Sequence, residues 1–358
     1  MAEPDVRKGM PAVKLSRGEF EQRFRSRFHD PAFAPLGDEL DRIIAAAWDA
    51  YSNSRKAPRT RKAGVGFADP EYEIASDWLA GRDAILEAQR RHDDPRQQPR
   101  ILLINGSPRS EHTCPGEMSK TWRLVEQAES VFDAMEFAVD RLDLSRITSE
   151  FGKTIHPCKA CVATSMALCH WPCSCYPNYS LGQTDDWMNE IYPLWVAAHG
   201  IMIITPVHWY QAPTTLKAMM DRLVCADGGN PDPSSTHGKV AKEAKALELE
   251  GWPYPRHLAG RFFGVAVHGD STGAENLRRA LTDWLSDMAL VSAGSMAETD
   301  GYIGYMEPYA TSHAALDNDP AFQEQVRNVA RALGRAVILA REGHFIQPGE
   351  GLHDPRPK

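Results

Sequence analysis

Short, continuous apolar runs recur along the sequence and alternate with segments of helical periodicity. The runs ILLI at 101–104, GIMIITP at 200–206 and RFFGVAVHG at 261–269 are typical of strands that are buried on both faces of a sheet. MEFAVDRLDL at 135–144 and LVSAGSM at 290–296 are predicted to form two further strands. Because helical patterns separate these segments, the sequence predicts an α/β fold with a doubly wound, five-stranded parallel sheet.

The predicted helices of this domain occupy the stretches between the strands. They are SKTWRLVEQAESVFDAM (119–135), DDWMNEIYPLWVAA (185–198), APTTLKAMMDRLV (212–224), ENLRRALTDWLSDMA (275–289) and AFQEQVRNVARALGRAVILARE (321–342). We therefore expect residues 99–300 to form the sheet domain. A polar insertion at 227–260 interrupts it, and residues 301–358 form a C-terminal loop, helix and tail that pack on it.

The first 98 residues have a different character and are predicted to form a helical extension and linker. Helical spacing is present at 37–51, and a second helix is predicted to begin at Asp69-Pro70. The basic segment SRKAPRTRKAG at 54–64 is predicted to be a loop between these helices. Its basic side chains either bind the 2′-phosphate of a nicotinamide nucleotide or form a solvated face; they are Arg55, Lys56, Arg59, Arg61 and Lys62.

The charge balance bears on the partners that this chain can have. Lysine and arginine number 40 against 48 aspartates and glutamates, which gives a net charge of -8. An acidic chain is poorly suited to nucleic acid or to an anionic membrane surface. No run reaches the length of a membrane span, and the N-terminus lacks the apolar core of a signal peptide. We therefore expect a cytoplasmic protein without nucleic-acid or membrane partners.

A loop with phosphate-binding chemistry follows the first strand directly. Asn105-Gly-Ser-Pro-Arg109 leads toward a helix that begins near Ser119-Lys-Thr121. Ligands of doubly wound sheets lie at the carboxyl ends of the strands, and a helix N-terminus offers N–H groups to an anion. The residues expected to bind a phosphate monoester are Ser107, Arg109, Ser119, Lys120 and Thr121. Neither an ATPase P-loop nor a dinucleotide glycine motif is present, and a turn without a ligand is the alternative.

Three blocks of sequence resemble the NADPH-dependent FMN reductase and iron–sulfur flavoprotein group of flavodoxin-like proteins. The first is ILLINGSPR with SKTWRLVE, and the second is IHPCKAC at 155–161 with TDDWMNEIYP at 184–193. The third, IITPVHWYQAPTTLKAMMDRL at 203–223, is the most specific, because a proline loop, an aromatic and an L-K-x-x-x-D-R helix occur together. The matches run across about residues 100 to 295. The resemblance implies a flavodoxin-like fold that binds FMN and takes electrons from NADPH or NADH.

The third block also suggests where the flavin ring binds. An isoalloxazine ring needs a flat apolar or aromatic wall and donors at its edge. The residues predicted to bind it lie at the ends of the predicted strands at 200–206 and 261–269 or directly after them. They are Pro206, Val207, His208, Trp209, Tyr210, His268 and Gly269. His208 and Trp209 are predicted to be catalytic; the alternative is that Trp209 and Tyr210 are core residues.

The chain departs from the family in an insertion at 110–118 and in His208, where a tyrosine is common.

The cysteines are concentrated in one short stretch. Five of the seven lie between positions 158 and 175. Cys158, Cys161, Cys169 and Cys173 are the predicted metal ligands, whereas Cys175 is expected to point away if this stretch is extended. Iron–sulfur flavoproteins carry four cysteines at the equivalent place, but the spacing here differs. A [4Fe–4S] cluster, a zinc site and a cysteine-rich loop without metal all stay open.

Three functions are compatible with these features. The first is an FMN-dependent oxidoreductase that passes electrons from NAD(P)H to a small-molecule acceptor, such as a quinone or a flavin. The second is an iron–sulfur flavoprotein that carries electrons to a protein partner, and the third is a non-catalytic flavin-binding protein. We expect a homodimer or homotetramer. Tyr302, Tyr305 and Tyr309 either cap the site of a neighbouring subunit or pack within the chain.

Overall fold

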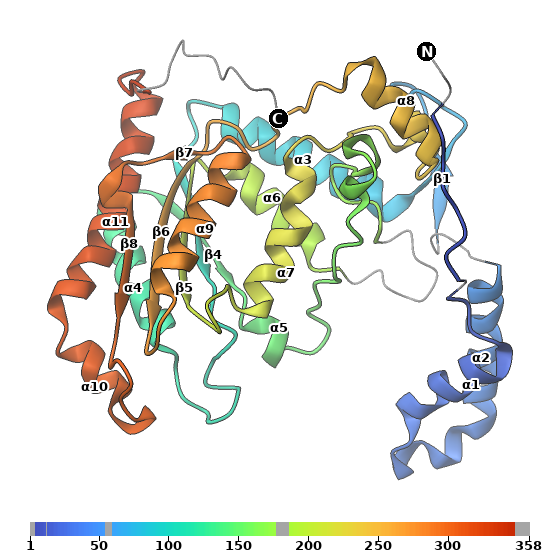
Figure 1. Cartoon of the computed structure of the whole chain (residues 1–358), viewed down its shortest axis with the longest axis horizontal. Coiled ribbons are helices and arrows are strands. Elements are labelled where there is room, and N and C mark those ends of the chain that lie inside the picture. Colours follow the sequence, from blue (N-terminus) through green and yellow to red (C-terminus); the bar gives the residue numbers. More distant parts are fainter. Residues whose placement is uncertain (1–3, 12, 54–58, 177–185, 348–358) are drawn as a thin grey trace. The chain divides into compact units, whose positions relative to one another are not determined.

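The computed structural model describes residues 4–11, 13–53, 59–176 and 186–347 (Figure 1). The chain divides into two compact units. The first, here called the cysteine unit, comprises residues 1–83, 156–187 and 228–255. The second, called the sheet unit, comprises residues 84–155, 188–227 and 256–358. The predicted division into an extension of 1–98, a domain of 99–300 and a C-terminal part of 301–358 stays a proposal.

The sheet unit is built around parallel strands. In spatial order they are β4 (Ala138–Asp143), β3 (Arg100–Asn105), β5 (Gly200–Pro206), β6 (Phe262–Gly269) and, beside β6, both β7 (Val291–Ser292) and β8 (Glu298–Tyr302). Ile101 pairs with Val139 on one side and with Gly200 on the other, and Gly200 pairs with Phe262. This order is that of the flavodoxin-like sheet, so the predicted doubly wound parallel fold is confirmed.

The fifth strand position differs from the prediction. A single strand was expected at 290–296, but β7 ends at Ser292 and the chain turns through Gly294, whose φ is +98°. A short 3₁₀ turn, η7 (Ser295–Ala297), follows, and the chain then returns to the sheet as β8. A positive φ is incompatible with a regular strand and is accessible to glycine without strain, so the break falls at this residue.

Helices cover both faces of the sheet (Figure 1). On one face, α4 (Lys120–Ala134) and α11 (Pro320–Arg341) share a buried apolar cluster with the strands, including Ile101, Leu124 and Leu333. α6 (Met188–Ala197), α7 (Thr214–Leu223) and α9 (Ala274–Asp287) cover the other face, where Trp195 and Trp284 meet edge to face. Two short helices complete the unit, α5 (Arg146–Ser149) and α10 (Ser312–Asp317).

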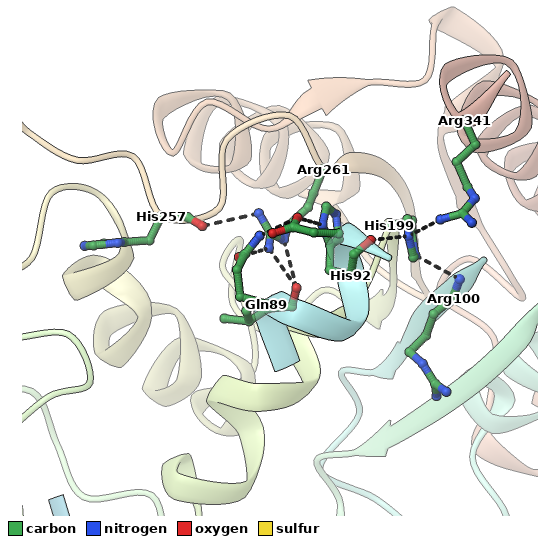
Figure 2. A network of polar contacts seen from close by, with 9 residues as sticks. Gln89, His92, Arg100, His199, His257, Arg261 and Arg341 are labelled. Atoms are coloured by element: carbon green, nitrogen blue, oxygen red, sulfur yellow. Dashed lines mark hydrogen bonds and ion pairs between the residues drawn. The ribbon is translucent and has the colours of Figure 1, made fainter. Parts of the chain in front are cut away.

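A polar network joins the second part of α3 (Ser76–Asp93) to the N-terminal end of the sheet (Figure 2). The Arg261 guanidinium is 3% exposed and donates to the side-chain oxygen of Gln89 at 2.9 Å. The Nδ1 of His199 accepts from the Arg100 backbone N–H at 3.1 Å, and its Nε2 lies 3.1 Å from the His92 carbonyl oxygen. Burial lowers the pKa of His199 to about 4, so this imidazole is neutral near pH 7.

The N-terminal segments agree with the prediction only in part. The first helix, α1 (Arg17–Arg25), and the predicted helix α2 (Gly37–Ser52) are present. The helix expected from Asp69 begins instead at Ser76, because Asp69 and Pro70 lie in the turn of a hairpin between β1 (Thr60–Lys62) and β2 (Glu73–Ala75). Thus part of the predicted basic loop is a strand; Arg55 and Lys56 lie outside the described residues.

The cysteine unit joins segments that are far apart in sequence. The insertion contributes a 3₁₀ turn, η6 (Pro233–Thr236), and the helix α8 (Ala241–Gly251). Asn230 donates its backbone N–H to the Cys169 carbonyl at 2.7 Å and accepts from the Trp171 N–H at 2.9 Å. The buried indole of Trp78 donates to the Pro172 carbonyl at 2.7 Å. No helix among the described residues combines the length and the apolar character required to cross a bilayer.

Candidate functional site

A cavity of about 120 Å³ lies at the C-terminal ends of β3, β5 and β6, within the sheet unit. All of the predicted cofactor-binding residues except Trp209 and Tyr210 line it. The complete lining is Ser107, Arg109, Met118, Ser119, Lys120, Thr121, Pro206, Val207, His208, His268, Gly269, Asp270, Tyr309, Ser312 and His313. Parallel strands bring their carboxyl ends to one edge of the sheet, which explains why three loops from distant parts of the sequence meet here.

The loop after β3 is held by its own polar side chains. Asn105 accepts the Ser107 N–H at 3.2 Å, and Ser107 Oγ accepts the Arg109 N–H at 3.1 Å. A side chain at Gly106 would place its Cβ 2.6 Å from the hydroxyl of Thr205 on β5. The close approach of these two strands at the cavity therefore requires glycine at position 106.

The N-terminus of α4 faces the same cavity. Ser119 is the N-cap, and its hydroxyl accepts the Trp122 N–H at 3.1 Å. The N–H groups of Lys120 and Thr121 are not used within the helix, so this end attracts an anion. Lys120 Nζ donates to the Ile303 carbonyl at 3.3 Å, and burial lowers the pKa of its ammonium group.

Two buried nitrogen atoms at the cavity lack partners among the described residues: Arg109 Nε and His268 Nδ1. The other ring nitrogen of His268 lies 2.8 Å from the Thr121 hydroxyl. Burial, reinforced by Lys120 and His208, lowers the pKa of His268 to about 3, so the ring is neutral. Buried polar atoms are nearly always hydrogen-bonded in folded proteins. These two atoms therefore mark a place where a polar ligand group is expected.

The loop after β5 holds its aromatic side chains out of the protein. His208 and Gln211 exchange backbone hydrogen bonds at 3.0 and 2.9 Å. Between them Trp209 and Tyr210 adopt positive φ values of 49° and 65°. Trp209 is 94% exposed and Tyr210 is 54% exposed, so the alternative interpretation of both as core residues is wrong. Neither lines the cavity, and their predicted contact with a flavin ring stays a prediction.

The C-terminal part of the chain contributes to the same cavity. Tyr309, Ser312 and His313 line it, and the Arg109 guanidinium lies 5.7 Å from the Tyr309 ring centroid. Tyr309 was expected either to cap a neighbouring subunit or to pack; here it borders the site of its own chain. Sequence reasoning missed Ser312 and His313, because no local motif links them to a loop about 200 residues earlier.

Comparison with known proteins identifies the family of this chain. Residues 99–301 match the family of NADPH-dependent FMN reductases. The chain belongs to this family. An iron–sulfur flavoprotein of Methanosarcina thermophila is 31% identical to it over 125 residues. That match covers 35% of the chain and 52% of the relative, so the chain spans about half of the relative's length.

Two solved structures resemble this FMN reductase family member at low sequence identity. RosB with a bound riboflavin-phosphate intermediate is 12% identical with a TM-score of 0.47, over 69% of this chain and 82% of RosB. The NAD(P)H:quinone oxidoreductase of Methanothermobacter marburgensis is 16% identical with a TM-score of 0.35, over 69% of this chain and 98% of that protein.

The cysteines of this FMN reductase family member are arranged differently from the prediction. Cys161 Sγ and Cys175 Sγ are 3.3 Å apart, so the expectation that Cys175 points away is wrong. The prediction assumed that the chain is extended at Cys173 and Cys175, but residues 171–176 form bends and a turn. The hydrogen bond with Cys175 lowers the pKa of Cys161 to about 7, whereas the pKa of Cys175 is raised.

No group of three or more His, Cys, Asp or Glu side chains suited to a metal ion occurs in the described part of the chain. None of the seven cysteines forms a disulfide there. A metal site at Cys158, Cys161, Cys169 and Cys173 therefore stays a prediction.

Proposed function

We propose that this protein is an FMN-dependent oxidoreductase that takes electrons from NADPH or NADH and passes them to a small acceptor such as a quinone or a flavin. The observation that carries the proposal is a pair of buried nitrogens, Arg109 Nε and His268 Nδ1, that have no hydrogen-bond partner in the described part of the chain and lie in a cavity at the carboxyl edge of the sheet. Membership in the NADPH-dependent FMN reductase family supports both the cofactor and the donor.

The phosphate of FMN fits the side of the cavity formed by Arg109 and the start of α4. Arg109 and Lys120 supply positive charge, and the cavity lining contains one carboxylate, Asp270, among the described residues. The backbone N–H groups of Lys120 and Thr121 add donors, and charge-assisted hydrogen bonds to phosphate are strong. The neutral His268, held by Thr121, would donate or accept at Nδ1 according to its tautomer.

The ring of FMN would lie against Pro206, Val207 and Gly269, where the loops after β5 and β6 meet. When bound, FMN supplies the electron-transfer chemistry, and the protein supplies placement and electrostatics. His208 borders the cavity; partial burial lowers its pKa, and Asp270 opposes that effect. A neutral His208 is suited to hold one hydrogen bond at the ring edge. The exposed Trp209 is available to an approaching donor or acceptor.

A steady-state assay tests this function. FMN-loaded protein should oxidise NADPH or NADH continuously when a soluble quinone is present, and slowly in its absence. The control is Arg279→Gln, which changes an exposed arginine of α9 away from the cavity and should leave the rate unchanged. Failure to oxidise either nicotinamide with quinone, flavin or oxygen as acceptor would refute the proposal.

A second candidate, an iron–sulfur flavoprotein that carries electrons to a protein partner, is favoured by the cysteine segment and by the matched relative. Anaerobically prepared protein would then contain about four irons per chain, the content of one [4Fe–4S] cluster. Iron and FMN measured on the same sample separate the two candidates. A homodimer or homotetramer in the cytoplasm remains part of the proposal, and size measurement in solution tests the oligomeric state.

A further inference from the structure

The cysteine unit contains a second cavity with chemistry of its own. It measures about 400 Å³ and is lined by Tyr72, Lys159, Ala160, Cys161, Thr164, Leu168, Ser174, Cys175, Gly238 and Lys239. It shares no residue with the cavity at the edge of the sheet. Both Cys161 and Cys175 are partly exposed at its surface, and their sulfur atoms are 3.3 Å apart. Two thiols in such contact can form a disulfide after a small movement.

The positive charge of this cavity favours thiol-reactive molecules that are anionic. Lys159 and Lys239 line it, and among the described residues no acidic side chain does. The ammonium of Lys159 lies 4.6 Å from the Tyr176 ring centroid, which holds it near the thiols. A small molecule that carries carboxylates is therefore attracted more strongly than a neutral one of the same reactivity.

We propose that Cys161 and Cys175 form a redox-active dithiol site that reacts with an anionic low-molecular-weight disulfide in this cavity. The two sulfur atoms are in hydrogen-bond contact, and either thiol can be the donor. The thiolate of one of these cysteines attacks one sulfur of the disulfide, the sulfur–sulfur bond of that molecule breaks, and one thiolate leaves. The thiolate of the other cysteine then attacks the sulfur of the first and expels the second thiolate. The protein loses two electrons and two protons, and the disulfide becomes two thiols.

The test uses full-length, flavin-containing protein, first reduced and then handled without oxygen. Excess oxidised glutathione is the anionic probe, and bis(2-hydroxyethyl) disulfide is the neutral probe. The number of thiols measured after denaturation should fall from seven to five, and a peptide map should show one Cys161–Cys175 link. In Cys175→Ser the reaction should stop with one glutathione on Cys161. The exposed Cys114, in the sheet unit, provides the control: Cys114→Ser should still lose two thiols.

Reaction rates of a lysine variant test the preference for an anionic disulfide independently. Lys239→Gln should slow the reaction with oxidised glutathione about twofold to fivefold, the range for one exposed charge pair, and leave the rate with the neutral disulfide unchanged. Equal slowing of both probes would overturn the selection of an anionic disulfide.

The dithiol itself would be overturned by seven thiols after treatment, by a link between other cysteines, or by bound iron that shields Cys161 until it is chelated. The thiol count and the peptide map use the wild-type protein. They therefore show whether Cys161 and Cys175 form a disulfide even if a cysteine variant does not fold. Neither measurement depends on the activity assigned to the flavin site.

Discussion

Arg109 offers the sharpest test of where a flavin phosphate binds. Its Nε is buried without a partner among the described residues, and its side chain lines the cavity in front of α4. In Arg109→Gln the positive charge and its hydrogen bonds are lost while much of the side-chain volume is kept. A hydrogen bond to a charged group contributes about 1.5–3 kcal/mol. At 1.36 kcal/mol per factor of ten, the Kd for FMN should rise about 10-fold to 150-fold.

Riboflavin, which lacks the phosphate, makes this prediction specific. Fluorescence titration of flavin-free protein gives the Kd of each flavin for the wild type and for Arg109→Gln. The preference for FMN over riboflavin should collapse in the variant, while riboflavin affinity stays within about twofold, a free-energy difference of about 0.4 kcal/mol. Arg279→Gln, with the same change on the exposed side of α9, should keep the preference. Equal weakening of both flavins would show that Arg109 supports the ring or the fold, and would refute the phosphate assignment.

Three further predictions follow from particular contacts. Trp209→Ala should change the unfolding free energy by less than about 0.5 kcal/mol, because the side chain is 94% exposed. The same variant should alter the rate of flavin reduction about twofold to tenfold. An unchanged rate would contradict the proposed contact of Trp209 with an electron donor or acceptor. Gly106→Ala should destabilise the protein by about 1–3 kcal/mol, because its Cβ would meet Thr205, whereas Gly18→Ala meets nothing and serves as the control in thermal unfolding. His199, with a folded pKa of about 4 against about 6.5 when unfolded, contributes stability that is fully present above pH 6.5 and is lost as the pH falls toward 4. That loss should be about 1–2 kcal/mol after screening by solvent, and denaturant titrations of His199→Asn should show a flatter pH dependence.

The sheet and the cavity could be predicted because their signals are local. The apolar runs of β3, β5 and β6 belong to strands that are buried on both faces, so each is visible by itself in the sequence. Since parallel strands end at one edge, the residues that follow them were expected to meet, and the loops after all three strands do line one cavity.

The features that sequence reasoning missed depend on how segments pair in the fold, which local patterns do not specify. The hairpin of β1 and β2 is closed by a turn at Asp69 and Pro70, two residues that equally well begin a helix. The Cys161–Cys175 contact requires the chain to fold back, whereas the C-x-x-C spacing drew attention to Cys158 and Cys161. His313 reaches the cavity through the C-terminal segment, for which the sequence carries no motif.

The proposed function requires that the cavity at the edge of the sheet binds FMN. The most direct measurement is to denature the purified protein, or protein reconstituted with a mixture of flavins, and to identify the released flavin by chromatography. We expect FMN at about one molecule per chain, because the start of α4, with Arg109 and Lys120, is the one place in the cavity proposed to bind a phosphate. Release of FAD alone, or no flavin binding even after reconstitution, would contradict it.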